Sequence, residues 1–435
     1  MSSKNIILII CFAAAFLTIA AIVFFFPSSK TAESYGILMF GHKQINFPGC
    51  YTQDYVPVMF YINTYENFSI NEIDLNKFLP SNITKGLSLI HEIRSFKINN
   101  KNYLLMGFAP NKFMILSSEN KLDFDKLKIE LEDDLDTRLR AMDIGDVYGD
   151  GLKEIVVGTR PKGIVEIYKL VEGKWNGYQL TVLNETIHNL AIADTDGNGL
   201  NEIILTTSFT LEYPESKRIE PGRIIKFEFN KSNKSWNESV VWEFEKTMVN
   251  STLISQHARY LFIDDFDQDG IKEIVANTKE SPLTEQLIGP RNLESFKWNG
   301  SGYSKTAIEN RLQINPNAVT FGDMDNDGKN EILAFTQAGD ALLSYKFKDG
   351  KWEKSILFRE AANDKESVVS VKIINQSESG YKKIFYVTSP RPDLVFADTN
   401  LYVLAYNPSK AEWEKSKIDE IPAKIYIWGI FSVPS

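Results

Sequence analysis

Cysteine and histidine are scarce in this chain of 435 residues, and their scarcity excludes two ways of building a protein. Of the two cysteines, Cys11 and Cys50, the first lies inside an apolar run, so no disulfide framework can hold a small fold together. No G-x-S-x-G or H-E-x-x-H motif occurs, and the histidines are scattered, so no local pattern indicates an enzyme. The histidines are His42, His91, His188 and His257.

Basic residues are fewer than acidic ones. The chain has 48 Lys and Arg against 57 Asp and Glu, and the net charge of -9 argues against a nucleic-acid partner. Hydrophobic residues make up 43% of the chain, which is enough for a sizeable core and excludes wholesale disorder.

The longest apolar run lies at the N-terminus. Ile6–Phe26 carries no charge, and as a helix with a rise of about 1.5 Å per residue it would span about 31 Å, the thickness of a bilayer core. A cleaved signal sequence, which would have a shorter apolar region, is the alternative. The run predicts a transmembrane anchor over residues 5–26, after a tail of residues 1–4 and before a linker of residues 27–35 and a domain of residues 36–435.

Glycosylation acceptors indicate the side of the membrane on which this domain lies. Asn-X-Ser/Thr is more frequent than chance predicts, although an Asn/Ser-rich loop composition would produce the same pattern. We expect a single-pass protein of the cell membrane with its domain outside the cell. The acceptors are Asn67, Asn82, Asn184, Asn230, Asn233, Asn237, Asn250, Asn299 and Asn375.

Four segments of the chain repeat one pattern, an apolar run, then D-x-D-x-D-G-x-x-E, then a second apolar run. Agreement of four loops over nine positions is difficult to obtain by accident. The flanking runs, such as EIVVGT and EIILTT, are β-branched, so the loops are predicted to join strands. The four loops cover residues 146–154, 194–202, 265–273 and 323–331.

The alternation of acids gives these loops the chemistry of a cation site. Side chains at loop positions one, three and five converge when glycine at position six permits a sharp turn, and their hard oxygens suit Ca²⁺. We predict two to four structural Ca²⁺ ions, with an Asp/Asn/Gly hairpin free of metal as the alternative. The predicted ligands are Asp146, Asp150, Glu154, Asp194, Asp196, Asn198, Glu202, Asp265, Asp267, Asp269, Glu273, Asp323, Asp325, Asp327 and Glu331.

The loops differ in the ligands that they offer. The loops at 265–273 and 323–331 carry four acids each, whereas Asn198 replaces one carboxylate in the loop at 194–202. The loop at 146–154 has Tyr148 at position three and is predicted to be the weakest site.

The motif resembles the FG-GAP or VCBS-type repeat of integrin alpha-subunit propellers and of many microbial surface proteins. Phe321-Gly322 keeps the opening of the literal signature, and Val157-Gly158-Thr159 approximates its end. The resemblance implies a β-propeller in which each loop joins the first and second strands of a blade and holds calcium. It says little about function, because the module is widely reused.

Blade counting extends the repeat over the chain. Second strands are predicted to begin at Leu104, Ile155, Ile203, Ile274, Ile332 and Ile384, with a further set of strands around Met59. The terminal strand Ile425–Val433 is expected to complete the first blade. The predicted fold class is therefore all-β, a seven-bladed β-propeller with an N-terminal transmembrane helix.

Tryptophan recurs once per predicted blade, at the expected turn between third and fourth strands. This regularity favours a structural role over stacking on sugars. The tryptophans are Trp175, Trp236, Trp298, Trp352 and Trp413.

A ligand is expected at the face opposite the calcium loops, as the resemblance implies. Polar residues stand six positions before the first ligand of each loop, at the start of apolar strands: Arg140, His188, Arg259 and Asn317. Arg138 and His257 lie two residues before Arg140 and Arg259. Solvated strand ends are one explanation for them, and a partly cationic mouth of the central channel, suited to an acidic group, is the alternative.

These features favour a membrane-anchored extracellular binding or adhesion module for a protein or glycan ligand, without catalytic residues. A calcium-dependent polysaccharide-active enzyme, such as a lyase, is one alternative, because paired carboxylates leave no local motif. A structural subunit of a cell-envelope complex is another.

Overall fold

The computed structural model describes residues 8–9, 22–27, 33–44, 55–62, 70–80, 90–119, 124–208, 221–249, 252–282, 291–312, 314–325, 327–336, 341–359, 366–374, 382–390, 400–407, 409–410, 412–420 and 425–427. Within these residues the chain is all-β, apart from two short 3₁₀ turns at Leu75–Lys77 and Phe124–Lys126. Contacts divide the chain into two compact units. One comprises Met1–Leu135, Asn317–Tyr345 and Lys354–Ser435, and the other Asp136–Pro316 and Lys346–Glu353.

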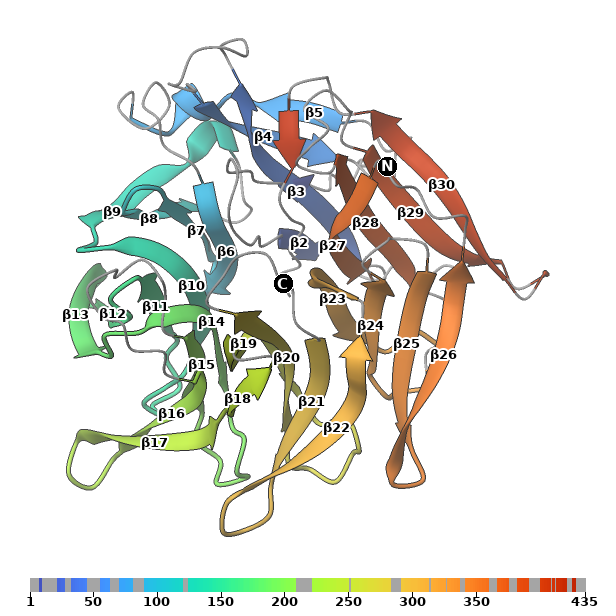
Figure 1. Ribbon diagram of the computed structural model, residues 1–435. Coiled ribbons are helices and arrows are strands. Elements are labelled where there is room, and N and C mark those ends of the chain that lie inside the picture. Colours follow the sequence, from blue (N-terminus) through green and yellow to red (C-terminus); the bar gives the residue numbers. More distant parts are fainter. Residues whose placement is uncertain are drawn as a thin grey trace. The chain divides into compact units, whose positions relative to one another are not determined.

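The first unit opens with a six-stranded sheet (Figure 1). Its strands are β1 (Leu8–Ile9), β2 (Ile22–Pro27), β3 (Glu33–Gln44), β4 (Tyr55–Ile62), β5 (Ile70–Ile73) and β31 (Ile425–Ile427). β31 pairs with β3 as an antiparallel strand, so the predicted contribution of the C-terminal strand to the first sheet is confirmed for residues 425–427. Residues 428–433 lie outside the described part of the chain.

The predicted transmembrane helix over residues 5–26 is wrong. Residues Leu8–Ile9 and Ile22–Pro27 are strands, and Phe24–Pro27 pair with Glu33–Gly36. Among the described residues, no helix is long and apolar enough to span a membrane. Isoleucine, valine and phenylalanine favour strands where a partner strand is available, and residues 24–27 of β2 find one in β3. The first sheet consequently differs from a four-stranded blade, and the predicted fold class of seven blades behind a separate helix is corrected to an all-β chain.

Two other four-stranded antiparallel sheets lie entirely in the first unit. One consists of β6 (Ile90–Ile98), β7 (Lys101–Phe108), β8 (Lys112–Glu119) and β9 (Lys128–Asp134). The other consists of β27 (Glu366–Ile374), β28 (Lys383–Pro390), β29 (Asn400–Asn407) and β30 (Glu412–Glu420). A further sheet has residues in both units: β23 (Ile314–Gly322), β24 (Glu331–Thr336), β25 (Ala341–Lys348) and β26 (Lys351–Arg359).

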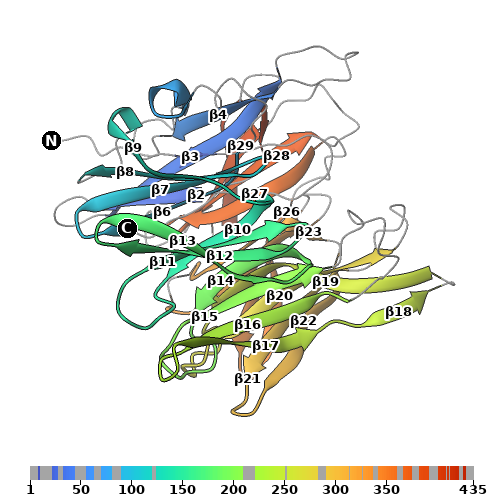
Figure 2. The same cartoon turned by 90° about the vertical axis from the view of Figure 1, so that its left-hand side faces the viewer.

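The second unit contains three consecutive antiparallel sheets, whose strands lie side by side in Figure 2. The first has β10 (Arg138–Gly145), β11 (Glu154–Arg160), β12 (Ile164–Val171) and β13 (Lys174–Val182). The second has β14 (Thr186–Ala193), β15 (Glu202–Ser208), β16 (Arg223–Asn230) and β17 (Ser235–Glu243). The third has β18 (Lys246–Val249), β19 (Thr252–Asp264), β20 (Glu273–Pro282), β21 (Arg291–Trp298) and β22 (Tyr303–Leu312).

Hydrophobic packing between consecutive sheets of the second unit forms its core. Every residue of β11 and β15 is buried, as expected for strands covered on both faces. Val156 of β11, Ile187 of β14 and Leu205 of β15 belong to one cluster. The six predicted second-strand positions fall in β7, β11, β15, β20, β24 and β28, so the sequence periodicity located these strands correctly.

The tryptophans of the hairpins between third and fourth strands pack against other aromatic residues rather than extend into solvent. Trp236 packs edge-on against Tyr148, with ring centroids 5.6 Å apart, and Trp352 lies 5.6 Å from Phe266. Tyr148 and Phe266 both belong to acidic loops, so these two hairpins cover loops of other sheets within the second unit. This packing favours the structural role of the tryptophans.

Candidate calcium loops and a basic cluster

The four acidic loops share one backbone design. Glycine at position six has a positive φ in each loop, between 84° and 92°, a conformation that costs glycine little. The residue at position two donates its backbone N–H to the glutamate at position nine, with N···Oε2 distances of 2.7 to 3.2 Å. The glutamates, which were predicted only as metal ligands, therefore also close the loops; they are Glu154, Glu202, Glu273 and Glu331.

Aspartate at position one accepts backbone N–H groups from the turn that follows. In the second loop, Asp194 accepts from Gly197, Asn198 and Gly199 at 2.8 to 3.2 Å. Position five repeats the arrangement, because Asn198 accepts from Leu200 at 2.8 Å. These bonds preorganise the acids around a turn with or without a cation.

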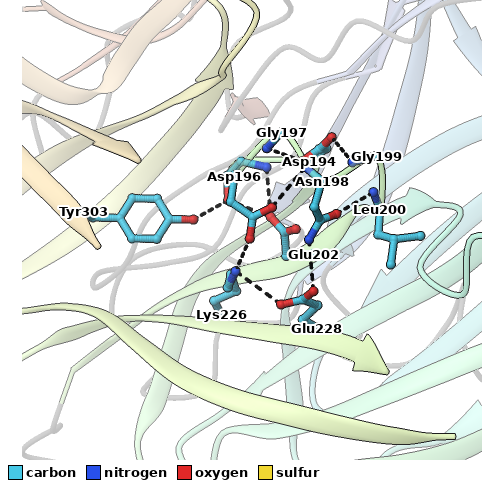
Figure 3. A network of polar contacts seen from close by, with 11 residues as sticks. Asp194, Asp196, Gly197, Asn198, Gly199, Leu200, Glu202, Lys226, Glu228 and Tyr303 are labelled. Atoms are coloured by element: carbon cyan, nitrogen blue, oxygen red, sulfur yellow. Dashed lines mark hydrogen bonds and ion pairs between the residues drawn. The ribbon is translucent and has the colours of Figure 1, made fainter. Parts of the chain in front are cut away.

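Three of the loops gather oxygen ligands tightly enough to hold a cation. Asp194, Asp196 and Glu202 offer atoms within 4.8 Å of one another. The same holds for a group in the third loop and one in the fourth: Asp265, Asp267 and Asp269, and Asp323, Asp325 and Glu331. In Figure 3 the side chains of Asp194, Asp196 and Glu202 converge beside Lys226.

Glu202 provides the test of whether a cation fits. Its side chain is 0% exposed, and its Oε2 accepts both the N–H and the hydroxyl of Thr195 at 2.8 and 2.7 Å. Its Oε1 has no hydrogen-bond partner among the described residues. Burial raises the pKa of Glu202 to about 7, although the Thr195 bonds oppose the rise. A buried carboxylate oxygen beside two aspartates suits a hard cation such as Ca²⁺.

Each loop also faces a lysine of the chain itself. Lys226 of β16 contacts Asp196 at 2.6 Å. Lys297 of β21 contacts three acids of the third loop: Asp269 at 2.7 Å, Glu273 at 2.9 Å, and also Asp267. Burial opposes the charge of Lys297, but its three acidic partners outweigh burial and raise its pKa. In the fourth loop, Lys382 contacts Asp323 at 3.8 Å.

The first loop is closed by an aromatic ring and a lysine. Tyr148 hydrogen-bonds to Tyr178 and lies edge-on against Phe229, 4.7 Å between centroids. Lys169 contacts Asp150 at 2.7 Å and Glu154 at 3.4 Å, and its Nζ lies 4.4 Å from the Tyr148 ring. This loop lacks the compact oxygen group found in the other three.

The predicted ligand residues occupy a repeated irregularity of the strands. The pairing of β10 with β11 skips Arg140, that of β14 with β15 skips His188, and that of β19 with β20 skips Arg259. The corresponding strands β6 and β27 carry the same bulge. Asn317 lies in β23, in the other unit, and its side chain is outside the described residues.

The structure places further basic groups near His188. Its ring stacks on His257, with centroids 5.0 Å apart, and its Nε2 is 2.6 Å from the Ser208 hydroxyl. Burial lowers the pKa of His188 well below its ordinary value, and the charges of His257, Arg259, Arg140 and Arg160 lower it further. Arg160 was not among the predicted ligand residues. It pairs with Arg138 across the β10–β11 hairpin, which brings it to the end of the strands where Arg140 lies.

The glycosylation motif has a structural explanation at some hairpin tips. Asn230 accepts the N–H of Ser232, Asn233 that of Ser235 and Asn299 that of Ser301, each at 3.0 or 3.1 Å. Such turns select Asn-X-Ser without any glycan. Asn184 and Asn237 are exposed and lie outside these turns, whereas Asn67, Asn82, Asn250 and Asn375 are outside the described residues.

Comparison with known proteins identifies the fold only. No protein-family model and no curated protein sequence matches the chain. The structure is similar to the BP39L lectin from Burkholderia pseudomallei, with a TM-score of 0.53 and 8% identity, over 93% of this chain and 100% of that one. A structure of BBS1N in complex with ARL6DN covers 75% of this chain and 91% of its own, with a TM-score of 0.39 and 10% identity. The likeness to the lectin, together with the succession of antiparallel sheets, assigns the chain to the β-propeller class.

Proposed function

We propose that this protein is an extracellular binding module whose loops of the FG-GAP or VCBS type hold structural Ca²⁺, and which recognises a protein or glycan ligand. The observation that carries the calcium proposal is the orphaned Oε1 of Glu202, buried beside Asp194 and Asp196. A cation there would bind acids that otherwise repel one another, and binding to the folded state alone would raise stability.

The lysines make the proposal more specific. The second and fourth loops are the best calcium sites, because their compact oxygen groups include the buried glutamate, Glu202 or Glu331, and Lys226 engages one acid of the second loop. The third loop already receives an ammonium group that contacts three acids. The first loop lacks a ligand at position three. Two Ca²⁺ ions of higher affinity are therefore proposed, at the lower end of the predicted two to four.

A Glu202→Gln variant separates calcium binding from the hydrogen bonds that close the loop. The amide oxygen still accepts the Thr195 N–H, but its neutral group is a poorer calcium ligand. Calcium titration of the chelator-treated protein should stabilise the parent by about 2.7 kcal/mol at a free calcium concentration 100 times the Kd, and the variant by much less. A parent protein whose thermal unfolding is identical in calcium and in chelator would eliminate the structural-calcium proposal.

The binding role has a separate test. A lectin shares this fold class, so a glycan array is the first screen, followed by pull-down from the native source. Each is run in calcium and in chelator, with Asp194→Asn as the loop variant and exposed Lys174→Gln as the control. Retention of no glycan and no protein by the calcium-loaded parent would remove the binding role while leaving the calcium proposal intact.

A further inference from the structure

Three neighbouring strands of the second unit each insert one basic residue at the same register. The inserted residues are Arg140 in β10, His188 in β14 and Arg259 in β19. A β-bulge bends its strand and changes the direction of a side chain, and bulges occur frequently beside functional sites. β10 contacts β14, and β14 contacts β19, so the three bulges lie on adjacent strands.

Two more basic residues complete what we call the basic cluster, defined as Arg140, Arg160, His188, His257 and Arg259. Four of its members are only 3 to 8% exposed, and Arg259 is half-buried. The stacked rings of His188 and His257 lie 22° from parallel. Each bulge stands six residues before its acidic loop, which corresponds to about 20 Å along the strand. The cluster and the loops are therefore at opposite ends of these strands.

The cluster gathers three guanidinium groups and two imidazoles around one place in the fold. Three guanidinium groups stay protonated at any physiological pH. Burial is the largest cause of the lowered pKa of His188, and the charges of its four basic neighbours lower it further. An anion placed among these groups would be attracted by them. Guanidinium groups are suited to carboxylate, sulfate and phosphate oxygens because they donate paired N–H groups.

Unsatisfied polar atoms beside the bulges provide an independent reason to expect a ligand. His188 Nδ1, Thr206 Oγ1 and both side-chain polar atoms of Asn277 have no hydrogen-bond partner among the described residues. Thr206 and Asn277 are 0% exposed. They stand opposite the bulges, because Thr206 pairs with Asn189 and Asn277 with Tyr260. Buried polar groups are almost always satisfied in folded proteins, so these atoms indicate a polar group that binds here.

We propose that the basic cluster binds an oxyanion, a carboxylate, sulfate or phosphate group, at the end of the strands opposite the acidic loops. This rests on the proposed binding function and specifies the chemical group that is bound. Binding brings negative charge next to His188, whose charged neighbours are His257, Arg259, Arg140 and Arg160. The imidazole should therefore take up a proton when the anion binds, and affinity should increase as the pH falls.

The experiment is calorimetric titration of the full chain with sodium sulfate, inorganic phosphate and acetate at constant ionic strength, at pH 6.0 and 7.5. Acetate is planar, whereas sulfate and phosphate are tetrahedral, so their relative affinities distinguish a carboxylate site from a sulfate or phosphate site. We expect saturable binding that is tighter at pH 6.0 and at least tenfold weaker in His188→Gln and Arg259→Gln. Arg359→Gln removes an exposed guanidinium from the other unit and should bind as the parent does.

A second measurement applies if the variants do not fold. Histidine ring ¹⁵N spectra of the parent should show two rings whose shifts change on addition of the tighter anion. Unchanged spectra, absence of saturable binding by all three anions, or equal binding by the parent and by folded cluster variants would each overturn the proposal. None of these measurements involves calcium or a macromolecular ligand, so their failure is separable from failure of the proposed function.

Discussion

Replacement of Lys297 by methionine tests whether lysine and calcium serve the same purpose in the acidic loops. Lys297 is 28% exposed and contacts Asp267, Asp269 and Glu273. Methionine keeps much of the apolar stem and removes the charge, so the three acids lose a shared cation. Loss of one partner from a fully buried ion pair costs about 3–5 kcal/mol, and exposed pairs contribute about 0–1 kcal/mol. For this partly exposed group we expect a loss of about 1–3 kcal/mol in chelator.

Calcium should reverse the effect of the Lys297→Met substitution. The third loop would then present its acids without a competing ammonium, and a new site would contribute about 2.7 kcal/mol at a free calcium concentration 100 times its Kd. Urea unfolding and calcium titration of the parent and the variant measure both quantities. Lys351→Met is the control, because Lys351 is 69% exposed and its contact with Glu353 is 3.7 Å.

Either of two results would contradict this role of Lys297. If the variant is as stable as the parent in chelator, Lys297 does not neutralise the loop. If the variant is destabilised but binds no additional calcium, the loop depends on its lysine specifically and is not a latent cation site.

Three further predictions concern other parts of the chain. The pKa of His188 is lowered in the folded protein, so the unfolded state binds more protons below about pH 6.5. The free energy of unfolding should therefore decrease as the pH falls from there, by at most about 1.4 kcal/mol per pH unit. Urea unfolding between pH 5 and 8 measures this contribution, which should be absent in His188→Gln. Gly177→Ala would place a Cβ 2.5 Å from the buried Tyr168 ring, and the free energy of unfolding measured by chemical denaturation should decrease by about 1–3 kcal/mol. The control is Gly173→Ala, whose Cβ meets no atom within 4 Å and which tests the effect of a positive φ alone. Deletion of residues 424–435 removes β31 and leaves an edge of β3 unpaired, so light scattering should detect more self-association than in the full chain. Equal monodispersity of the two proteins would contradict the role of this pairing.

The acidic loops were predictable because their information is local. The spacing of Asp194, Asp196, Asn198 and Glu202 fixes a turn whose geometry depends on nine consecutive residues, and the β-branched residues on either side fix the strands. The same local reasoning identified the bulge positions, since Arg140, His188 and Arg259 each stand six residues before a loop. The reason for their spacing, one inserted residue per strand, became visible only in the strand register.

Other features of the fold depend on partners that are distant along the chain and leave no local pattern. The apolar run at residues 5–26 satisfies the length of a membrane helix, and only the pairing of β2 with β3 reveals a different use. The lysines that contact the first three loops lie on other strands of the same sheets, β12, β16 and β21. A signal for two of them was present, because Lys169 follows Tyr168 and Lys297 follows Phe296 at the same register.

The pairing of β31 with β3 has a consequence for the order of events during synthesis. The strand that borders residues 41–43 is made of residues 425–427, which are translated long after residues 41–43. The N-terminal sheet must therefore remain incomplete until residues 425–427 have left the ribosome, while the local sheets of residues 136–316 have all their strands available much earlier. A nascent chain stalled before residue 425 would carry folded local sheets beside an open N-terminal edge.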